Sequence, residues 1–172
     1  MFKIGEFVVY GHSGVCQVTS IDYPELAFHV GDKKLYYKLE PVCSTEVIYT
    51  PVDTKVLMRP VISSEQARQL LDRVREESKV PADVRSNMQD EYDALLKNQE
   101  CTGLLRIIKN IQYKKKDSLQ SGKKLTMTEQ RILKQAEELL SSELSVVMDK
   151  DLESIKSIID DVVTEWLARV YV

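Results

Sequence analysis

The spacing of apolar residues changes near Pro60, and this change constrains the fold more than any other feature of the 172-residue chain. Before Pro60, short apolar or alternating runs are separated by turn residues, a pattern typical of β-strands. From Ser63 onward, apolar residues recur every three or four positions, as they do on one face of a helix. We therefore predict an α+β chain with two domains, residues 1–62 and residues 63–172.

The first domain contains five runs that predict strands. Gly11 and Gly14 bracket the first turn, and Gly31 begins a two-residue hairpin loop. Five short strands in so few residues predict a small, strongly curved β barrel of the SH3 or Tudor type. The predicted strands are residues 7–10, 15–22, 26–30, 34–39 and 47–50.

The second domain is predicted to be compact and all-helical. Two helix starts have the capping-box spacing, in which the first and fourth residues satisfy each other's backbone N–H groups: Ser63 with Gln66, and Thr126 with Glu129. Trp166 lies in the apolar stripe of the last helix, where we expect it to pack. The predicted helices begin near Ser63, Pro81, Thr102, Thr126 and Asp151.

Basic residues are concentrated in residues 103–134, which we call the basic belt. This segment has nine basic and two acidic residues, a net charge of +7, although the whole chain has a net charge of −3. Such a cluster predicts salt-sensitive contact with nucleic-acid phosphates. An ordinary solvated helix surface explains it equally well. The candidate DNA-binding cations are Lys114, Lys115, Lys123, Lys124, Arg131 and Lys134.

The chain is expected to act in the cytoplasm and away from membranes. Its first residues lack the basic and apolar regions of a signal peptide, and no run approaches the roughly 18 apolar residues that span a bilayer. Cys16, Cys43 and Cys101 lie far apart without metal-binding or redox spacing. We interpret all three as reduced thiols that pack in the interior.

No motif in the chain indicates catalysis. His12 and Ser13 are neighbours on a predicted turn, and the G-x-S-x-G spacing of a nucleophile elbow is absent. His29 alternates with apolar residues in a predicted strand and is interpreted as structural. We therefore expect a protein that is not an enzyme and that uses no metal, no cofactor and no small-molecule substrate.

The run FKIGEFVVYGHSGV, residues 2–15, resembles the opening of CarD-type regulators and of the related polymerase-interacting module of transcription-repair coupling factors. Residues 36–39 are similar to the central strand of that family, and residues 47–53 to the strand and turn that follow. Residues 59–62 resemble its exit into the helical domain, and residues 125–144 its C-terminal helix pattern. The resemblance spans about residues 1–148.

The resemblance implies a bacterial transcription regulator. Members of this family bind the β-subunit lobe of RNA polymerase through an exposed strand edge of the barrel, and the helical domain contacts promoter DNA at the upstream fork of the melted bubble. Main-chain hydrogen bonds at such an edge supply affinity. Taken without the resemblance, residues 47–50 fit an ordinary core strand better. The polymerase-binding residues expected in this chain are Val47, Ile48, Tyr49, Thr50, Tyr23 and Tyr37.

The second helix departs from the family pattern. Well-known members have a tryptophan that wedges against the DNA minor groove, and this chain has Met88 at that position. A methionine can act as an apolar wedge, but the nearby Asp90, Glu91 and Asp93 would repel phosphates. The alternative function is a protein-interaction module that occupies the polymerase β lobe without contacting DNA.

Overall fold

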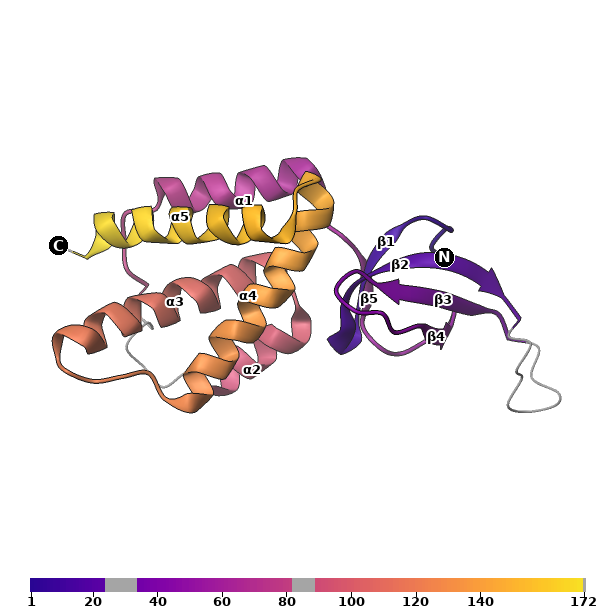
Figure 1. Ribbon diagram of the computed structural model, residues 1–172, viewed down its shortest axis with the longest axis horizontal. Helices are drawn as coiled ribbons and strands as arrows, with labels where there is room; N and C mark the ends of the chain where they lie inside the picture. Colours follow the sequence, from indigo (N-terminus) through magenta and orange to yellow (C-terminus); the bar gives the residue numbers. More distant parts are fainter. Residues whose placement is uncertain (24–33, 82–88, 172) are drawn as a thin grey trace. The chain divides into compact units, whose positions relative to one another are not determined.

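The computed structural model describes residues 1–23, 34–81 and 89–171. The chain divides into two units, Met1–Val61 and Ile62–Val172, which we call the sheet unit and the helical unit. Figure 1 shows strands in the first unit and helices in the second, so the predicted α+β fold class is confirmed.

The described residues of the sheet unit form a five-stranded antiparallel sheet with strand order β4-β3-β2-β1-β5. Among the described residues, β4 pairs only with β3 and β5 only with β1, so the sheet is not closed and a barrel is not confirmed. The predicted strand at residues 26–30 lies outside the described residues. The strands are β1 (Phe7–Tyr10), β2 (Gly14–Asp22), β3 (Tyr36–Pro41), β4 (Ile48–Pro51) and β5 (Met58–Pro60).

Alternation along the strands directs one set of side chains into a small core. This core buries Val8, Cys16, Val18, Tyr37 and Leu39. Burial raises the pKa of the Cys16 thiol to about 11, which keeps it protonated and unreactive at neutral pH. Cys101 is also buried, but Cys43 is exposed, so the prediction that all three thiols pack in the interior is wrong for Cys43.

The turn between β1 and β2 requires glycine at two positions. Gly11 and Gly14 have φ angles of +46° and +69°, a region that L side chains rarely adopt. A Cβ atom on Gly11 would also lie 2.8 Å from a methyl group of Val56. Between the glycines, His12 and Ser13 are exposed in a single 3₁₀ turn.

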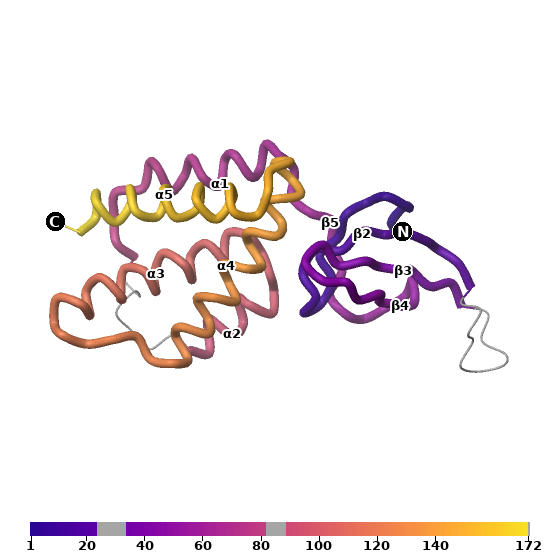
Figure 2. Tube along the Cα trace, viewed as in Figure 1, coloured from indigo at the N-terminus to yellow at the C-terminus, as the bar shows by residue number. Residues whose placement is uncertain are grey.

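The helical unit contains five helices in the described residues. Figure 2 shows α1 beside α5, and the chain from α3 returning through a loop to α4. The predicted second helix is described only from residue 89. The third helix begins at Cys101, one residue before its predicted start. The helices are α1 (Ser64–Glu76), α2 (Gln89–Asn98), α3 (Cys101–Gln120), α4 (Met127–Met148) and α5 (Leu152–Val170).

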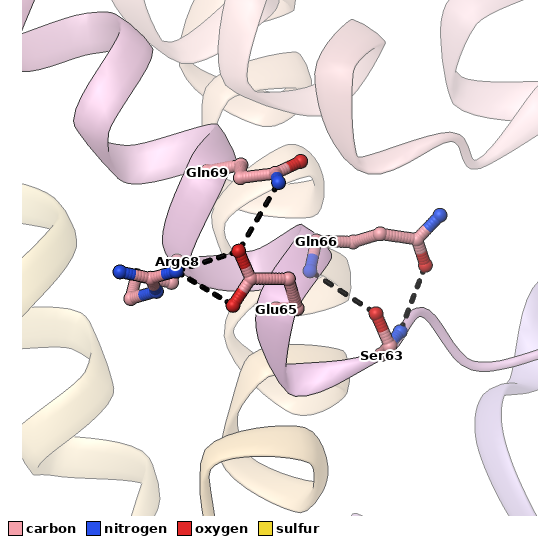
Figure 3. A network of polar contacts seen from close by, with 5 residues as sticks. All are labelled: Ser63, Glu65, Gln66, Arg68 and Gln69. Carbon is pink, nitrogen blue, oxygen red and sulfur yellow. Dashed lines mark hydrogen bonds and ion pairs between the residues drawn. The ribbon is translucent and has the colours of Figure 1, made fainter.

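Both predicted capping boxes are present. The Ser63 hydroxyl accepts from the Gln66 N–H, and the Gln66 side chain accepts from the Ser63 N–H, as Figure 3 shows beside an ion pair of Glu65 with Arg68. Thr126 and Glu129 make the same pair of bonds at the start of α4. These bonds satisfy N–H groups that have no partner inside the helix.

One apolar core joins all five helices. Trp166 is fully buried, as predicted, and its ring packs near Tyr113. Leu104, Leu140 and Ile155 bring α3, α4 and α5 into the same cluster. None of the helices in the described part of the chain is long and apolar enough to cross a membrane.

The capping box of α4 can be tested by Thr126→Ala. We expect this change to lower the free energy of unfolding by about 1 kcal/mol, because one N–H group loses its partner. The measurement is urea unfolding followed by circular dichroism. The matched control, Thr164→Ala at an exposed position within α5, should not destabilise the protein, because alanine has the higher helix propensity. Equal losses in the two variants would contradict the assigned role of Thr126.

Candidate functional site

The outer edge of β4 is the first candidate interaction surface. β4 pairs with β3 in a continuous register in which Ile48 faces Leu39 and Thr50 faces Tyr37. Figure 1 shows β4 as the last strand on its side of the sheet among the described residues. A strand that pairs on one side presents unpaired main-chain groups on the other, where another chain can add a strand.

The register fixes which main-chain groups point outward from β4. The Val52 N–H donates to the Leu35 carbonyl at 3.0 Å. Directly opposed antiparallel residues alternate between bonded and non-bonded pairs, so Ile48 and Thr50 direct their N–H and C=O groups toward β3. Tyr49 directs its N–H and C=O outward. Pro51 offers only its carbonyl there, because proline has no N–H.

Three of the six predicted polymerase-binding residues expose their side chains. Tyr49 is 59% exposed, Tyr23 56% and Val47 47%. Tyr49 lies opposite Lys38, and opposed residues share a face of the sheet. Tyr23 follows Asp22, the last residue of β2. The exposed face of β4 therefore presents an aromatic ring beside a lysine.

The other three predicted residues face the core. Thr50 is 2% exposed, and its hydroxyl accepts from the Tyr10 hydroxyl at 3.0 Å. Tyr37 is equally buried, and its hydroxyl accepts from the Phe2 N–H at 3.0 Å. Ile48 packs against the same core. These side chains hold β4 in position and are not available as surface contacts.

The opposite edge of the sheet is less available. β5 has three residues, and Pro60 supplies no N–H. The side chain of Met58 packs against the core, and the chain continues directly from β5 into the helical unit. Of the two edges, β4 is the better candidate for pairing with a partner strand.

The second candidate surface is a groove in the helical unit, which we call the lysine groove. Its lining residues come from the end of α3, the following loop and the first turns of α4. Figure 1 shows that these three segments follow one another at one end of the α3–α4 pair. The lysines of the groove are exposed, and within the described part of the chain they form no ion pair. The groove is lined by Lys115, Leu119, Lys123, Lys124, Leu125, Gln130, Leu133, Lys134 and Glu137.

The structure thus brings together four of the predicted DNA-binding lysines, and it places two other cations elsewhere. Lys114 forms an ion pair with Glu129 in the capping box of α4. Burial disfavours the charged form of Glu129, but hydrogen bonds from Lys114 and from the Thr126 N–H outweigh it and lower the pKa of this carboxyl. Lys114 therefore stabilises a helix start. Arg131 is exposed on α4 but does not line the groove.

Met88, the predicted apolar wedge, lies outside the described residues. The described part of α2 begins with acidic residues, Asp90 and Glu91 in its first turn. Glu91 pairs with Arg106 at 2.9 Å. Tyr92 is buried in the helical core. The start of α2 is therefore an acidic surface.

Three leucines line the lysine groove, Leu119, Leu125 and Leu133, and we call them its leucine floor. Sequence reasoning missed them. Leu119 is 65% exposed, and Leu125 and Leu133 lie partly buried beside it. The sequence feature that could have indicated them is Leu119, which is the one apolar residue in the run from Lys114 to Gly122. An apolar residue off the buried stripe of a helix is a weak indicator of a contact surface.

Residues 2–62 match the family model described as the CarD-like/TRCF RID domain. The match covers the sheet unit and ends at the first residue of the helical unit. No curated protein matches the chain. The family likeness thus covers the unit that contains β4, and it says nothing of the lysine groove.

Glu137, at the inner end of the lysine groove, is expected to make stability depend on pH. Burial raises the pKa of its carboxyl, against a hydrogen bond from Gln112. The contribution of this group to stability is therefore complete below the ordinary pKa of a glutamate carboxyl and is lost as the pH rises through the higher folded pKa. Glu137→Gln should raise the free energy of unfolding at pH 7 and have no effect near pH 3.

The measurement is urea unfolding of both proteins at the two pH values. Glu138→Gln, the same change at the exposed neighbouring position, should alter stability by less than about 0.5 kcal/mol at either pH. A Glu137→Gln variant less stable than the wild type at pH 7 would contradict the assigned cost of burial.

Proposed function

We propose that this protein, whose residues 2–62 form a CarD-like/TRCF RID domain, docks on the β-subunit lobe of RNA polymerase and modulates the stability of the promoter open complex. The domain family indicates an RNA polymerase-interacting role. The β lobe as the docking surface and the effect on the open complex are our proposal. It describes a regulator that acts in the cytoplasm by binding and not by catalysis.

The single observation that carries the proposal is the outer edge of β4. Tyr49 offers an N–H and a carbonyl to an added strand, and its exposed ring lies beside them. Main-chain bonds to a partner strand give affinity, and the outward side chains Val47 and Tyr49 give specificity. The buried Thr50 and Tyr37 stiffen the strand, so little conformational entropy is lost when a partner pairs with it.

Docking through the sheet unit would keep the helical unit close to the promoter. Tethering turns a weak second contact into an intramolecular one with a high effective concentration. The exposed lysines 115, 123, 124 and 134 support contact with DNA phosphates near the upstream fork. Such contact needs neither base recognition nor high intrinsic affinity.

A second candidate function is a module that occupies the β lobe without contacting DNA. The start of α2 favours it, because the exposed Asp90 would repel a phosphate backbone, whereas Glu91 is paired with Arg106. Lys114, one of the predicted DNA-binding residues, forms an ion pair with Glu129 and is therefore less available to DNA. The two candidates differ in whether the lysines act on DNA.

The role of the β4 edge can be tested by comparing Tyr49→Pro with Tyr49→Ala. Both variants lose the ring, but only proline also removes the outward N–H. The inward ladder to β3 uses Ile48 and Thr50, so Tyr49→Pro leaves those bonds in place. We expect Tyr49→Pro to bind an isolated polymerase β lobe about tenfold more weakly than Tyr49→Ala, from the loss of one hydrogen bond of about 1 kcal/mol and of local strand pairing.

Binding is measured by calorimetry, with circular dichroism confirming that both variants keep the sheet. Equal affinities for the two variants would rule out strand addition at Tyr49. A wild-type protein that does not bind the β lobe would overturn the proposed function as a whole. Ile48→Asp is not a useful probe, because its side chain packs in the core.

The role of the lysines can be tested with the double variant Lys123→Glu/Lys124→Glu. If the helical unit contacts promoter DNA, open-complex lifetime in a purified transcription system should change at least about threefold, with a weaker dependence on salt. The affinity for polymerase should stay unchanged. An unchanged lifetime in this variant, with polymerase binding intact, would favour the second candidate.

A further inference from the structure

We propose that the lysine groove binds an acidic amphipathic segment of a partner protein, with an apolar side chain on the leucine floor and carboxylates at the lysine rim. The groove is concave and combines three leucines with four lysines. This site belongs to the helical unit and uses the same four lysines as the DNA contact considered above, so the peptide would take the place of DNA there, in agreement with the second candidate function. Its proposed ligand does not depend on docking through β4.

The leucine floor is the first argument. Leu119 is 65% exposed, and Leu125 and Leu133 line the groove next to it. Met127, 81% exposed, follows two residues after Leu125. In the described part of the helical unit, Leu119 and Met127 are the large apolar side chains classed as exposed, and both lie at this end of the α3–α4 pair. Met127 does not itself line the groove, but Leu119 does, and an exposed apolar side chain in a hollow is typical of a contact surface.

The charge of the rim is the second argument. Lys115, Lys123, Lys124 and Lys134 are exposed and form no ion pair with any described residue. Two neighbouring lysines are in contrast occupied, since Lys114 pairs with Glu129 and Lys116 lies over the Tyr171 ring at 4.9 Å. Lys115 interacts electrostatically with Glu137 of the same lining, so among the described residues Lys123, Lys124 and Lys134 are the available cations of the rim. They complement an acidic ligand and speed its association.

The floor also distinguishes a protein ligand from a nucleic acid. A phosphate backbone would use the lysines but leave the leucines exposed to water. The residues that line the groove include no aromatic side chain on which a base could stack. An amphipathic helix instead offers apolar anchors at positions i, i+3 and i+4 with carboxylates on either side, which matches both parts of the groove.

The test uses the full-length protein and three fluorescent probes in an anisotropy titration. The first is a synthetic helical peptide of about 18 residues with leucines at i, i+3, i+4 and i+7 and glutamates elsewhere. The second is the same peptide with serine at each leucine position. The third is a duplex DNA of about 20 base pairs. We expect the leucine peptide to bind at least about tenfold more tightly than the serine peptide, because one leucine buried on the floor is worth about that factor.

Variants separate the floor from the rim. Leu119→Ser changes an exposed side chain, so the core is unaffected. It should weaken the leucine peptide about tenfold and leave the serine peptide and the DNA unchanged. Lys123→Glu/Lys124→Glu should weaken both peptides. The matched control, Lys79→Glu/Lys97→Glu, makes the same change in charge at exposed lysines outside the groove and should leave binding of the leucine peptide within about twofold.

Three results would overturn the proposal. The two peptides could bind equally, or Leu119→Ser could leave the leucine peptide unchanged, and either result would show that the floor is not used. Alternatively, DNA could bind more tightly than the leucine peptide and displace it, which would assign the groove to nucleic acid. None of these measurements includes polymerase, so their failure is distinct from failure of the proposed docking through β4.

Discussion

One-sided main-chain pairing of β4 is the constraint on which the functional interpretation depends. The antiparallel register with β3 sets the direction of every N–H and C=O group along β4. Thr50 directs its side chain into the core and its main-chain N–H and C=O toward β3. The next residue along the strand points the opposite way in both respects, so Tyr49 has an exposed side chain and main-chain groups at the free edge. The same alternation thus builds the small core and leaves an edge that another chain can extend. If another strand of the same chain paired with the outer side of β4, the N–H and C=O groups at that edge would be satisfied and no longer available to a partner protein.

In the helical unit, a buried carboxylate has a comparable organising role. Glu143 is 2% exposed; it accepts a hydrogen bond from the Ile62 N–H at 3.0 Å and one from the Cys101 thiol at 3.1 Å. It therefore links the first residue of the unit to α3 and α4. Burying a carboxylate costs free energy unless it is hydrogen-bonded. Removing its hydrogen-bond partners destabilises the fold by more than the hydrogen bonds themselves stabilise it. Such a group favours one arrangement of the chain over alternatives with similar apolar burial.

Periodicity and capping patterns predicted most of the elements, because these signals are local. Ser63 and Thr126 start their helices as expected, and Trp166 packs in the core. β5 was not predicted, because three residues ending in proline show no alternation and the strand exists only through pairing with β1. The inward turn of Tyr37 and the leucine floor of the groove were likewise unpredictable, since both depend on which residues distant in sequence come together.

The basic belt shows why composition alone does not define a binding site. Its lysines have similar sequence surroundings, yet the fold gives them different partners. Lys109 pairs with Glu77 and lies over the Trp166 ring, and Lys114 pairs with Glu129, so both stabilise helices. Lysines 115, 123, 124 and 134 instead surround a hollow floored by leucines. A charge that already has a buried or hydrogen-bonded partner gains little from a ligand. An exposed charge beside an apolar surface can gain a Coulomb interaction, which is stronger where the apolar surface excludes water. The part of the belt that can bind is therefore set by the ion pairs that the fold has already made.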